Sequence, residues 1–197
     1  MKVIDLGLCD YQKAYQKQMG FVEDRFSDRE KEDLLVFVEH PEVYTFGRKY
    51  KDEVPNSLVN TAVVERGGDA TYHNPGQLVC YPIIKLEESK RDLNLFLRYL
   101  EDQIIDVLAD FGIKSEAREK KTGVWIQGKE KKIASIGVAI KQWVSYHGFA
   151  LNVCNELSGF SKITPCGFNF EVMTSMQEEL KRPVDIEAVK AAFINAF

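Results

Sequence analysis

The chain contains 197 residues, of which 45% are hydrophobic and 28% are charged, and this balance is typical of one large globular domain. It excludes a disordered chain, a fibrous repeat and a small disulfide-stabilised scaffold. The 26 Lys and Arg residues against 30 Asp and Glu residues give a formal net charge of -4, whereas a dedicated nucleic-acid-binding protein carries a strong basic excess. We therefore expect no nucleic-acid partner, and any charged partner must be bound locally.

The sequence also indicates the compartment. No apolar run approaches the roughly 20 residues that a membrane-spanning helix needs, and Asp5 precedes any apolar region of the kind found in signal peptides. We therefore expect a cytoplasmic protein without membrane association. The four cysteines form no C-x-x-C pair, which argues against a zinc site and a disulfide framework. They are expected to be free thiols, most of them buried: Cys9, Cys80, Cys154 and Cys166.

Hydrophobic spacing in the first half predicts one helix followed by short strands. Asp10 is a candidate N-cap, and apolar residues recur at helical spacing over about residues 10–25. Residues 34–38 are typical of a buried strand. Further β-rich runs occupy residues 43–46, 62–64 and 78–84, the last interrupted or edged by Pro82.

The second half opens with the most strongly patterned element. Asp92 caps a predicted helix that continues to Phe111 and stops at Gly112. Three strands and a final helix follow, at 123–126, 132–140, 144–153 and from Asp185 to Phe197. Because groups of strands separate the helices, the pattern predicts an α+β fold rather than a doubly wound one. With no linker or repeat in the sequence, residues 1–197 are expected to form a single domain.

A glycine-rich segment at residues 66–77 is the densest signal for a ligand site. Its three glycines and one proline lie between apolar runs, as in loops that present backbone amides to a ligand. It matches neither the dinucleotide-binding pattern nor a phosphate-binding P-loop. Composition alone leaves an ordinary turn as an alternative, but Tyr72 and His73 favour a binding loop.

A second signal surrounds Cys166. Pro165 before it and Gly167 after it predict a turn that exposes the thiol and lets a backbone N–H approach a carbonyl oxygen. The alternative is a cysteine in an ordinary loop. A reactive thiolate would need a nearby cation.

Candidate cations lie in a basic segment at residues 112–141. It holds eight Lys and Arg residues against three acidic residues, a local charge of +5 that leaves -9 on the rest of the chain. Such a segment is commonly a solvated face, but it can also attract an acidic partner. Lys132 begins an apolar strand, where its ammonium group would be partly desolvated and could favour a thiolate. The alternative is a lysine that merely extends to solvent at the end of a strand. His147 is a separate candidate base, for which a structural, hydrogen-bonded role is the alternative.

Four motifs follow one another along the chain: RGGDATYHNPGQ at 66–77, KIASIG at 132–137, SYHGFALNV at 145–153 and PCG at 165–167. EHP at 39–41 and YTFGR at 44–48 lie upstream. In content and order these motifs resemble those of the lipoyl(octanoyl) transferases, and the resemblance covers nearly the whole chain. Asn74, Phe149 and Phe168 depart from the glycine, leucine and tyrosine that are common at these positions in the family.

The resemblance implies an acyltransferase with the α+β fold of biotin and lipoate protein ligases, a mixed sheet with packed helices. Its members transfer an octanoyl group from octanoyl-acyl carrier protein to a lysine of a lipoyl domain. The acceptors are the E2 subunits of 2-oxoacid dehydrogenases and the glycine-cleavage H protein. No metal or cofactor is implied, because the thioester arrives activated, and an acidic acyl carrier protein would suit the basic segment.

The resemblance also assigns roles to residues. Cys166 matches the nucleophile that carries the acyl thioester, and Lys132 the residue that lowers its pKa. Three segments match the acyl-binding site: Arg66, Gly67, Gly68, Asp69, Ala70, Thr71, Tyr72 and His73; Ser135, Ile136 and Gly137; and Gly148, Phe149 and Ala150. We expect Tyr72, Ile136 and Phe149 to wall an apolar tunnel. The alternatives are an ATP-dependent lipoate or biotin protein ligase and an inert acyl-binding adaptor.

Overall fold

A computed structural model of the protein describes residues 1–28, 30–164 and 169–197. Its centre is a seven-stranded mixed sheet with the strand order β1-β2-β6-β10-β9-β8-β7. Strands β1 and β2 run parallel, and the other neighbours are antiparallel. In sheet order the strands are Lys2–Leu8, Leu34–Glu39, Gln77–Ile83, Val144–Asn152, Lys132–Lys141, Lys121–Ile126 and Ser115–Arg118.

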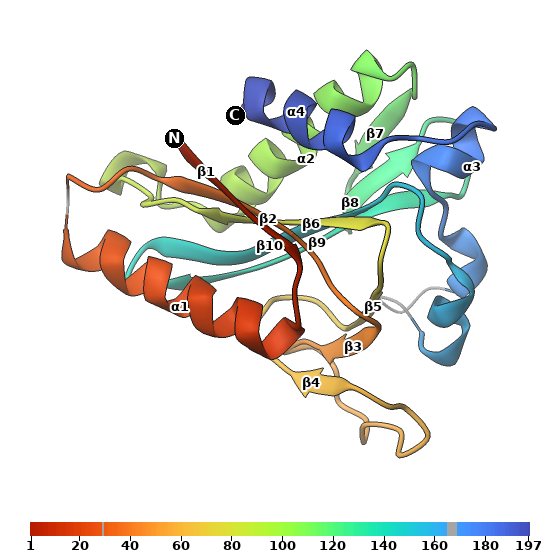
Figure 1. Ribbon diagram of the computed structural model, residues 1–197, viewed down its shortest axis with the longest axis horizontal. Helices are drawn as coiled ribbons and strands as arrows, with labels where there is room; N and C mark the ends of the chain where they lie inside the picture. Colours follow the sequence, from red (N-terminus) through yellow and green to blue (C-terminus); the bar gives the residue numbers. More distant parts are fainter. Residues whose placement is uncertain (29, 165–168) are drawn as a thin grey trace.

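Helices cover both faces of this sheet (Figure 1). Helix α1 (Tyr11–Ser27) lies on one face, and helices α2 (Leu93–Asp110) and α4 (Ile186–Ala196) lie on the other. Side chains of β2 alternate between the two faces of the sheet, so this strand contributes to the core on each face. Val36 and Val38 pack in the core beneath α1, whereas Leu35 and Phe37 join the core beneath α2 and α4.

Shorter elements complete the described chain. Helix α3 spans Met176–Leu180, and three 3-10 turns span Glu88–Lys90, Ser158–Lys162 and Phe170–Val172. No helix in the part of the chain that the structure describes is long and apolar enough to cross a membrane.

A three-stranded sheet lies beside the large one and carries part of the site (Figure 1). Its order is β4 (Thr61–Val63), β3 (Val43–Phe46) and β5 (Ala70–His73). Strand β3 pairs parallel with β4 and antiparallel with β5. The small sheet has its own apolar cluster, which includes Tyr44, Phe46, Tyr72 and Phe160.

The helix caps that the sequence predicts are present. Asp10 Oδ1 accepts a hydrogen bond from Lys13 N at 3.0 Å, and Asp92 Oδ1 accepts one from Asn94 N at 2.7 Å. Gly112, with φ +82°, follows α2, a conformation that favours glycine. Each side-chain cap stabilises its helix by about 1 kcal/mol. The three predicted helices are therefore confirmed, with ends shifted by no more than a few residues.

Three strands differ from the sequence-based expectation. The edge strands β1 and β7 are not predicted, because they are polar or only partly buried and their extended form comes from pairing with β2 and β8. Strand β5 lies inside the glycine-rich segment, where a loop is expected. Its four residues are all buried against β3, so tertiary pairing overrides the local turn signal.

Pro82 lies within β6, although we expect from the sequence that this proline interrupts the strand or lies at a sheet edge. It pairs with Leu35 of β2, but the β6–β10 ladder stops at Cys80 and Phe149. Proline has no N–H for that ladder. Opposite this gap, His147 of β10 has φ +54°, and its backbone N–H donates to the side chain of Gln18 in α1. The proline therefore leaves β10 irregular beside the site.

Candidate active site

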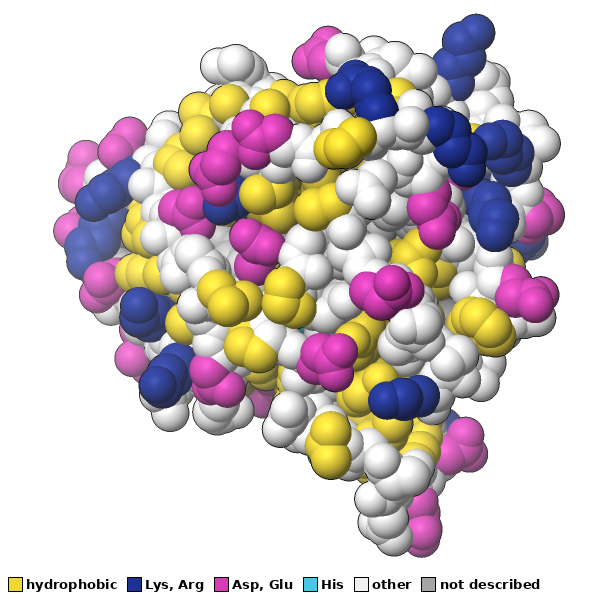
Figure 2. Space-filling model, turned by 45° about the vertical axis from the view of Figure 1, so that its right-hand side comes forward, with side chains coloured by type: hydrophobic (Ala, Val, Ile, Leu, Met, Phe, Trp, Pro, Cys, Tyr) yellow, Lys and Arg dark blue, Asp and Glu magenta, His cyan; other side chains and the backbone are white. Residues whose placement is uncertain are grey.

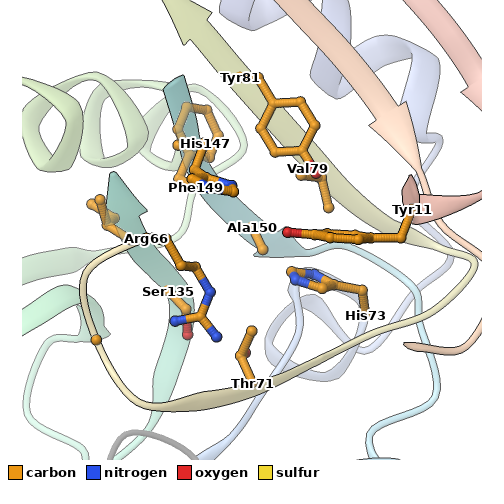
Figure 3. A pocket seen from close by; sticks show the side chains of 14 residues that line it. Tyr11, Arg66, Thr71, His73, Val79, Tyr81, Ser135, His147, Phe149 and Ala150 are labelled. Carbon is orange, nitrogen blue, oxygen red and sulfur yellow. The ribbon is translucent and has the colours of Figure 1, made fainter. Parts of the chain in front are cut away.

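A narrow cavity lies between the large sheet, the segment 66–73 and the start of α1 (Figure 3), with about 40 Å³ open to the centre of a water-sized sphere. Strands β9, β10 and β6 form its floor, segment 66–73 covers it, and the ring of Tyr11 enters from α1. The lining residues are Tyr11, Arg66, Gly68, Thr71, His73, Val79, Tyr81, Ser135, Ile136, Gly137, His147, Gly148, Phe149 and Ala150.

The cavity exists partly because small side chains form a row across its floor. Ser135 of β9 pairs with Ala150 of β10, and Ala150 pairs with Val79 of β6. Directly opposed residues in neighbouring strands point to the same face of a sheet. The row therefore leaves space above three adjacent strands.

Glycines let the covering segment approach the sheet closely. The Gly67 N–H donates to the Val138 carbonyl at 2.9 Å, and a Cβ on Gly137 would lie 2.7 Å from the Gly67 oxygen. A Cβ on Gly148 would collide with the Cys80 carbonyl. Larger residues at these two positions would displace the segment or the strand.

Arg66 anchors the covering segment to the small sheet. Its Nη2 donates to the Thr45 carbonyl at 2.8 Å and to Thr45 Oγ1 at 2.9 Å. The side chain is buried and lines the cavity. Charge-assisted hydrogen bonds of this kind are stronger than neutral ones, so Arg66 gives the segment a defined position.

Alternation along β5 divides the predicted acyl-binding residues into two groups. Thr71 and His73 line the cavity, whereas Ala70 and Tyr72 face the apolar cluster of the small sheet. The Tyr72 ring packs against Tyr44 with ring centres 4.8 Å apart and planes tilted by 31°. It therefore does not line the cavity, whereas the sequence predicts that it walls the acyl tunnel. Strand period explains the difference, since neighbouring residues point to opposite faces.

Gly67 and Asp69 also lie away from the cavity floor. Both line a neighbouring groove, and Asp69 Oδ1 accepts a hydrogen bond from Ala70 N at 2.8 Å. The remaining members of the three predicted segments line the cavity itself.

Two of the chain's three histidines, His73 and His147, line the cavity, and His40 lies next to His73 with ring centres 5.8 Å apart. His40 Nδ1 donates to the Cys9 carbonyl at 2.7 Å, and the Tyr81 hydroxyl donates to His40 Nε2 at 2.8 Å. His73 Nδ1 donates to Gln77 Oε1 at 2.7 Å. Burial lowers the pKa of His40 to about 4 and that of His73 to about 3, so both rings are neutral near pH 7.

His147 has a mixed environment. It is buried, lines the cavity and stacks with Tyr15 at 5.8 Å. Burial and the charge of Arg66 lower its pKa to about 4. Its Nε2 lies 3.8 Å from the Glu65 carboxylate. The sequence treats this residue as structural and misses its place in the cavity wall.

Lys132 lies in the neighbouring groove, which shares Gly68, Ile136 and Gly137 with the cavity. Although it is a lysine, it is only 2% exposed. Its Nζ donates to the Thr122 carbonyl at 2.8 Å and lies 5.5 Å from the centre of the Trp125 ring. Carbonyl and aromatic faces both stabilise a buried ammonium group.

Gly123 and Glu101 complete the surroundings of Lys132. A Cβ on Gly123 would lie 2.6 Å from Lys132 Cε, so the lysine occupies the space that a side chain would need. The Gly123 N–H donates to Glu101 Oε1 at 2.9 Å. Burial raises the pKa of Glu101. Sequence reasoning missed Glu101, because a single acidic residue on an apolar helix face gives no local signal.

Tyr11, Val79 and Tyr81 line the cavity and were also missed. Tyr11 follows the N-cap of a helix and the other two lie in an apolar strand, so each looks like a core residue. The predicted nucleophile Cys166 lies outside the described residues, and its contact with Lys132 stays a prediction. No group of three or more metal-ligating side chains occurs within residues 1–28, 30–164 and 169–197.

Solved structures with the same architecture identify the class of fold. Lipoate-protein ligase A bound with ATP gives a TM-score of 0.75 at 20% identity, over 100% of this chain and 83% of the other. A bi-partite lipoate protein ligase from Thermoplasma acidophilum gives 0.73 at 19%, over 100% and 81%. Biotin protein ligase from Aquifex aeolicus gives 0.55 at 13%, over 100% and 67%. The chain therefore has the α+β fold of lipoate and biotin protein ligases.

Sequence comparison is more specific. Residues 10–197 match the family model described as the lipoyl protein ligase A/B catalytic domain. A protein of Syntrophotalea carbinolica named Octanoyltransferase is 45% identical over 100% of this chain and 92% of its own length. An Octanoyltransferase of Geobacter sulfurreducens is 41% identical over 100% and 83%. The chain belongs to the lipoyl protein ligase A/B catalytic-domain family.

Proposed function

We propose that this acyltransferase moves an octanoyl group from octanoyl-acyl carrier protein to a lysine of a lipoyl domain, through a thioester on Cys166. The observation that carries the proposal is the position of Lys132, buried in a groove that shares three residues with a mostly apolar cavity of the kind that an acyl chain needs. Relatives that align with the whole chain at 45% and 41% identity are named Octanoyltransferase, which supports the same substrate.

In the first step the thiolate of Cys166 attacks the carbonyl carbon of the donor thioester. A new C–S bond forms to the enzyme, and the C–S bond to the carrier breaks. The carrier thiolate leaves and takes up a proton from the ammonium of Lys132, so that Lys132 is neutral at the start of the second step. One thioester replaces another, so the step needs no ATP. The ammonium of Lys132 favours the thiolate form of the cysteine.

In the second step a neutral lysine amine of the lipoyl domain attacks the enzyme thioester. The C–N bond forms, the C–S bond to Cys166 breaks, and the amide product makes the overall transfer favourable. We assign Lys132 as the group that accepts the proton of the attacking amine. Backbone N–H groups near Gly167 or in segment 66–73 would stabilise the oxyanion in both steps.

The proposed donor is acidic, which suits the charge distribution of the chain. Residues 112–141 carry a net +5, whereas the rest carries -9. Lys and Arg side chains gather at one corner of the face in Figure 2. The groove beside Lys132 also contains Lys49, Lys120 and Lys121. The cytoplasm is the compartment in which we place this reaction, and lipoyl domains of E2 subunits and the H protein are the proposed acceptors.

Intact-mass spectrometry tests the proposal directly. The full chain is mixed with octanoyl-acyl carrier protein in the absence of ATP, and then with a lipoyl domain. We expect one octanoyl group on the enzyme, its disappearance when the lipoyl domain is added, and no enzyme label in Cys166→Ala. Cys154→Ala is the matched control, because Cys154 is an exposed free thiol, and it should label like the wild type.

The two alternative functions give different results in this experiment. An ATP-dependent ligase would modify the lipoyl domain only when octanoate and ATP are supplied. An inert adaptor would bind the donor without a mass change in either protein. Labelling of Cys166→Ala at the wild-type rate would reject the assigned nucleophile.

A further inference from the structure

The side chains on the cavity floor define a path that runs across three strands. Ser135, Ala150 and Val79 form a row from β9 across β10 to β6. Neighbouring strands lie about 4.8 Å apart, so the row spans about 10 Å. The β9 end borders the groove of Lys132, because Gly68, Ile136 and Gly137 line both spaces. An acyl chain whose carbonyl is held near Lys132 must therefore extend along the row toward β6.

The far end of this path is closed by rings. Val79 and Tyr81 of β6 and Tyr11 of α1 line the cavity but not the Lys132 groove. Figure 3 shows the Tyr11 side chain entering above His73, with its hydroxyl end directed toward the middle of the cavity beside Ala150. A chain that advances from β9 therefore meets the hydroxyl end of Tyr11 beside Ala150 of β10, and the Tyr11 ring lies behind that hydroxyl.

Each added methylene lengthens the chain by a fixed amount. A peptide residue of three backbone bonds spans at most about 3.5 Å, so an extended chain advances roughly 1.2 Å per single bond. Two further methylenes would therefore move the end of the chain about 2.4 Å along the row toward the Tyr11 side chain.

Contacts on its outer side hold the Tyr11 ring in place. It stacks on His73, with ring centres 6.1 Å apart and planes at 16°, and packs against His40 at 5.1 Å. Hydrogen bonds to Gln77 and to the Cys9 carbonyl fix these two imidazoles. A ring supported in this way cannot move aside without breaking buried contacts, and the neutral imidazoles leave the wall uncharged.

We propose that Tyr11 is the residue that limits the acyl chain to about eight carbons, by closing the cavity at the end remote from Lys132. This inference rests on the proposed octanoyl transfer and adds a specificity-determining residue to it. Tyr11 touches the ω end of the chain and takes no part in the chemistry.

The test compares acyl donors of different length. Single-turnover acylation of the full-length enzyme is followed by intact-mass spectrometry with hexanoyl-, octanoyl-, decanoyl- and dodecanoyl-acyl carrier protein. One methylene in an apolar pocket changes specificity about 10- to 200-fold. We therefore expect Tyr11→Ala and Tyr11→Leu to raise the decanoyl-to-octanoyl rate ratio at least about tenfold.

Two control variants separate the size of the ring from other effects. Tyr11→Phe keeps the ring and should keep the wild-type ratio. Phe26→Ala removes an exposed ring near the other end of α1 that does not line the cavity, and it should also leave the ratio unchanged. A ratio that stays at the wild-type value in both Tyr11→Ala and Tyr11→Leu would overturn the assignment.

A variant on the sheet rather than on α1 covers the case in which the Tyr11 variants fail to fold. Ala150→Leu adds a side chain in the middle of the row and should raise the hexanoyl-to-octanoyl ratio. An unchanged ratio in that variant would show that the chain does not follow the row, which also overturns the inference. Absence of any acyl-enzyme in the wild type, at every chain length, would instead reject the proposed function.

Discussion

Gly123 and Lys132 share one volume of space at the site, since a Cβ on Gly123 would lie 2.6 Å from Lys132 Cε and 3.1 Å from Nζ. Gly123 also has φ +116°, a conformation that only glycine adopts readily. The lysine is therefore placed by the absence of a side chain on the neighbouring strand β8.

Gly123→Ala should consequently displace the ammonium of Lys132, together with the pairing strand β9, because the same Cβ would lie 2.5 Å from the Ala134 carbonyl oxygen. A misplacement of about 1 Å in catalytic geometry costs about a hundredfold in rate, and we expect an acylation rate reduced by this order. Single-turnover acylation measures it. Gly128→Ala is the matched control, because Gly128 has φ +74° in the next turn but open space around its Cβ position. Equal rates in the two variants would contradict the steric argument.

Lys132→Ala removes the proposed cationic neighbour of Cys166. A thiolate without that neighbour forms at higher pH, so acylation should slow at neutral pH and its pH profile should move upward. Rate measurements from pH 6 to 10 by intact mass check this prediction. Lys114→Ala, which removes an exposed lysine of the same basic segment, should leave the profile unchanged. A Lys132→Ala profile that coincides with that of the wild type would remove the activating role and leave the cysteine as nucleophile.

Arg66→Met should loosen the cover of the cavity. The variant loses the hydrogen bonds of a buried guanidinium, the two shortest of which go to Thr45, and hydrogen bonds to charged groups contribute about 1.5–3 kcal/mol each. We expect the free energy of unfolding in urea to fall by about 3 kcal/mol and the KM for the acyl donor to rise. Arg182→Met, an exposed arginine, serves as the control. Wild-type stability of Arg66→Met would refute the anchoring role.

The buried histidines should make stability depend on pH. The pKa values of His40 and His73 are lowered to about 4 and about 3, whereas unfolded histidine titrates near pH 6.5. The unfolded chain therefore binds more protons below pH 6.5, and stability is retained above that pH and decreases as pH falls toward 4.

Each of these histidines should contribute a loss on the order of 2 kcal/mol between pH 6.5 and 4. Urea unfolding at pH 7, 6 and 5 measures the dependence. His40→Gln removes one titrating group and should make the decrease shallower, at the cost of lower stability at pH 7. The same slope in the variant and the wild type would show that His40 does not carry the effect.

Much of the fold follows from local patterns. Asp10, Asp92 and Asp185 cap the three long helices as their sequence context indicates, because caps and apolar spacing act within one or two turns. The strands predicted at 123–126, 132–140 and 144–153 are confirmed as β8, β9 and β10. Strands β1, β5 and β7 could not be predicted, since pairing with distant residues makes them extended.

The site was only partly predictable for a related reason. Glycine-rich residues and the KIASIG motif mark where the chain comes close to a ligand, and most of these residues line the cavity. Tyr11 and Tyr81 carry no such mark, because a tyrosine in a helix or an apolar strand resembles any core residue. Tyr72 shows the opposite error, where a residue inside a motif points to the other face of β5.

The hydrogen bond from the His147 amide to Gln18 joins β10 to the helix that also carries Tyr11. Seating of α1 on the sheet and completion of the binding chamber are therefore one event. A chain from which α1 and the residues before it are removed would retain the strands that hold Lys132. It would lose Tyr11 from the cavity wall and the Gln18 side chain that accepts a hydrogen bond from β10. Such a fragment should bind fatty groups loosely and without regard to their size.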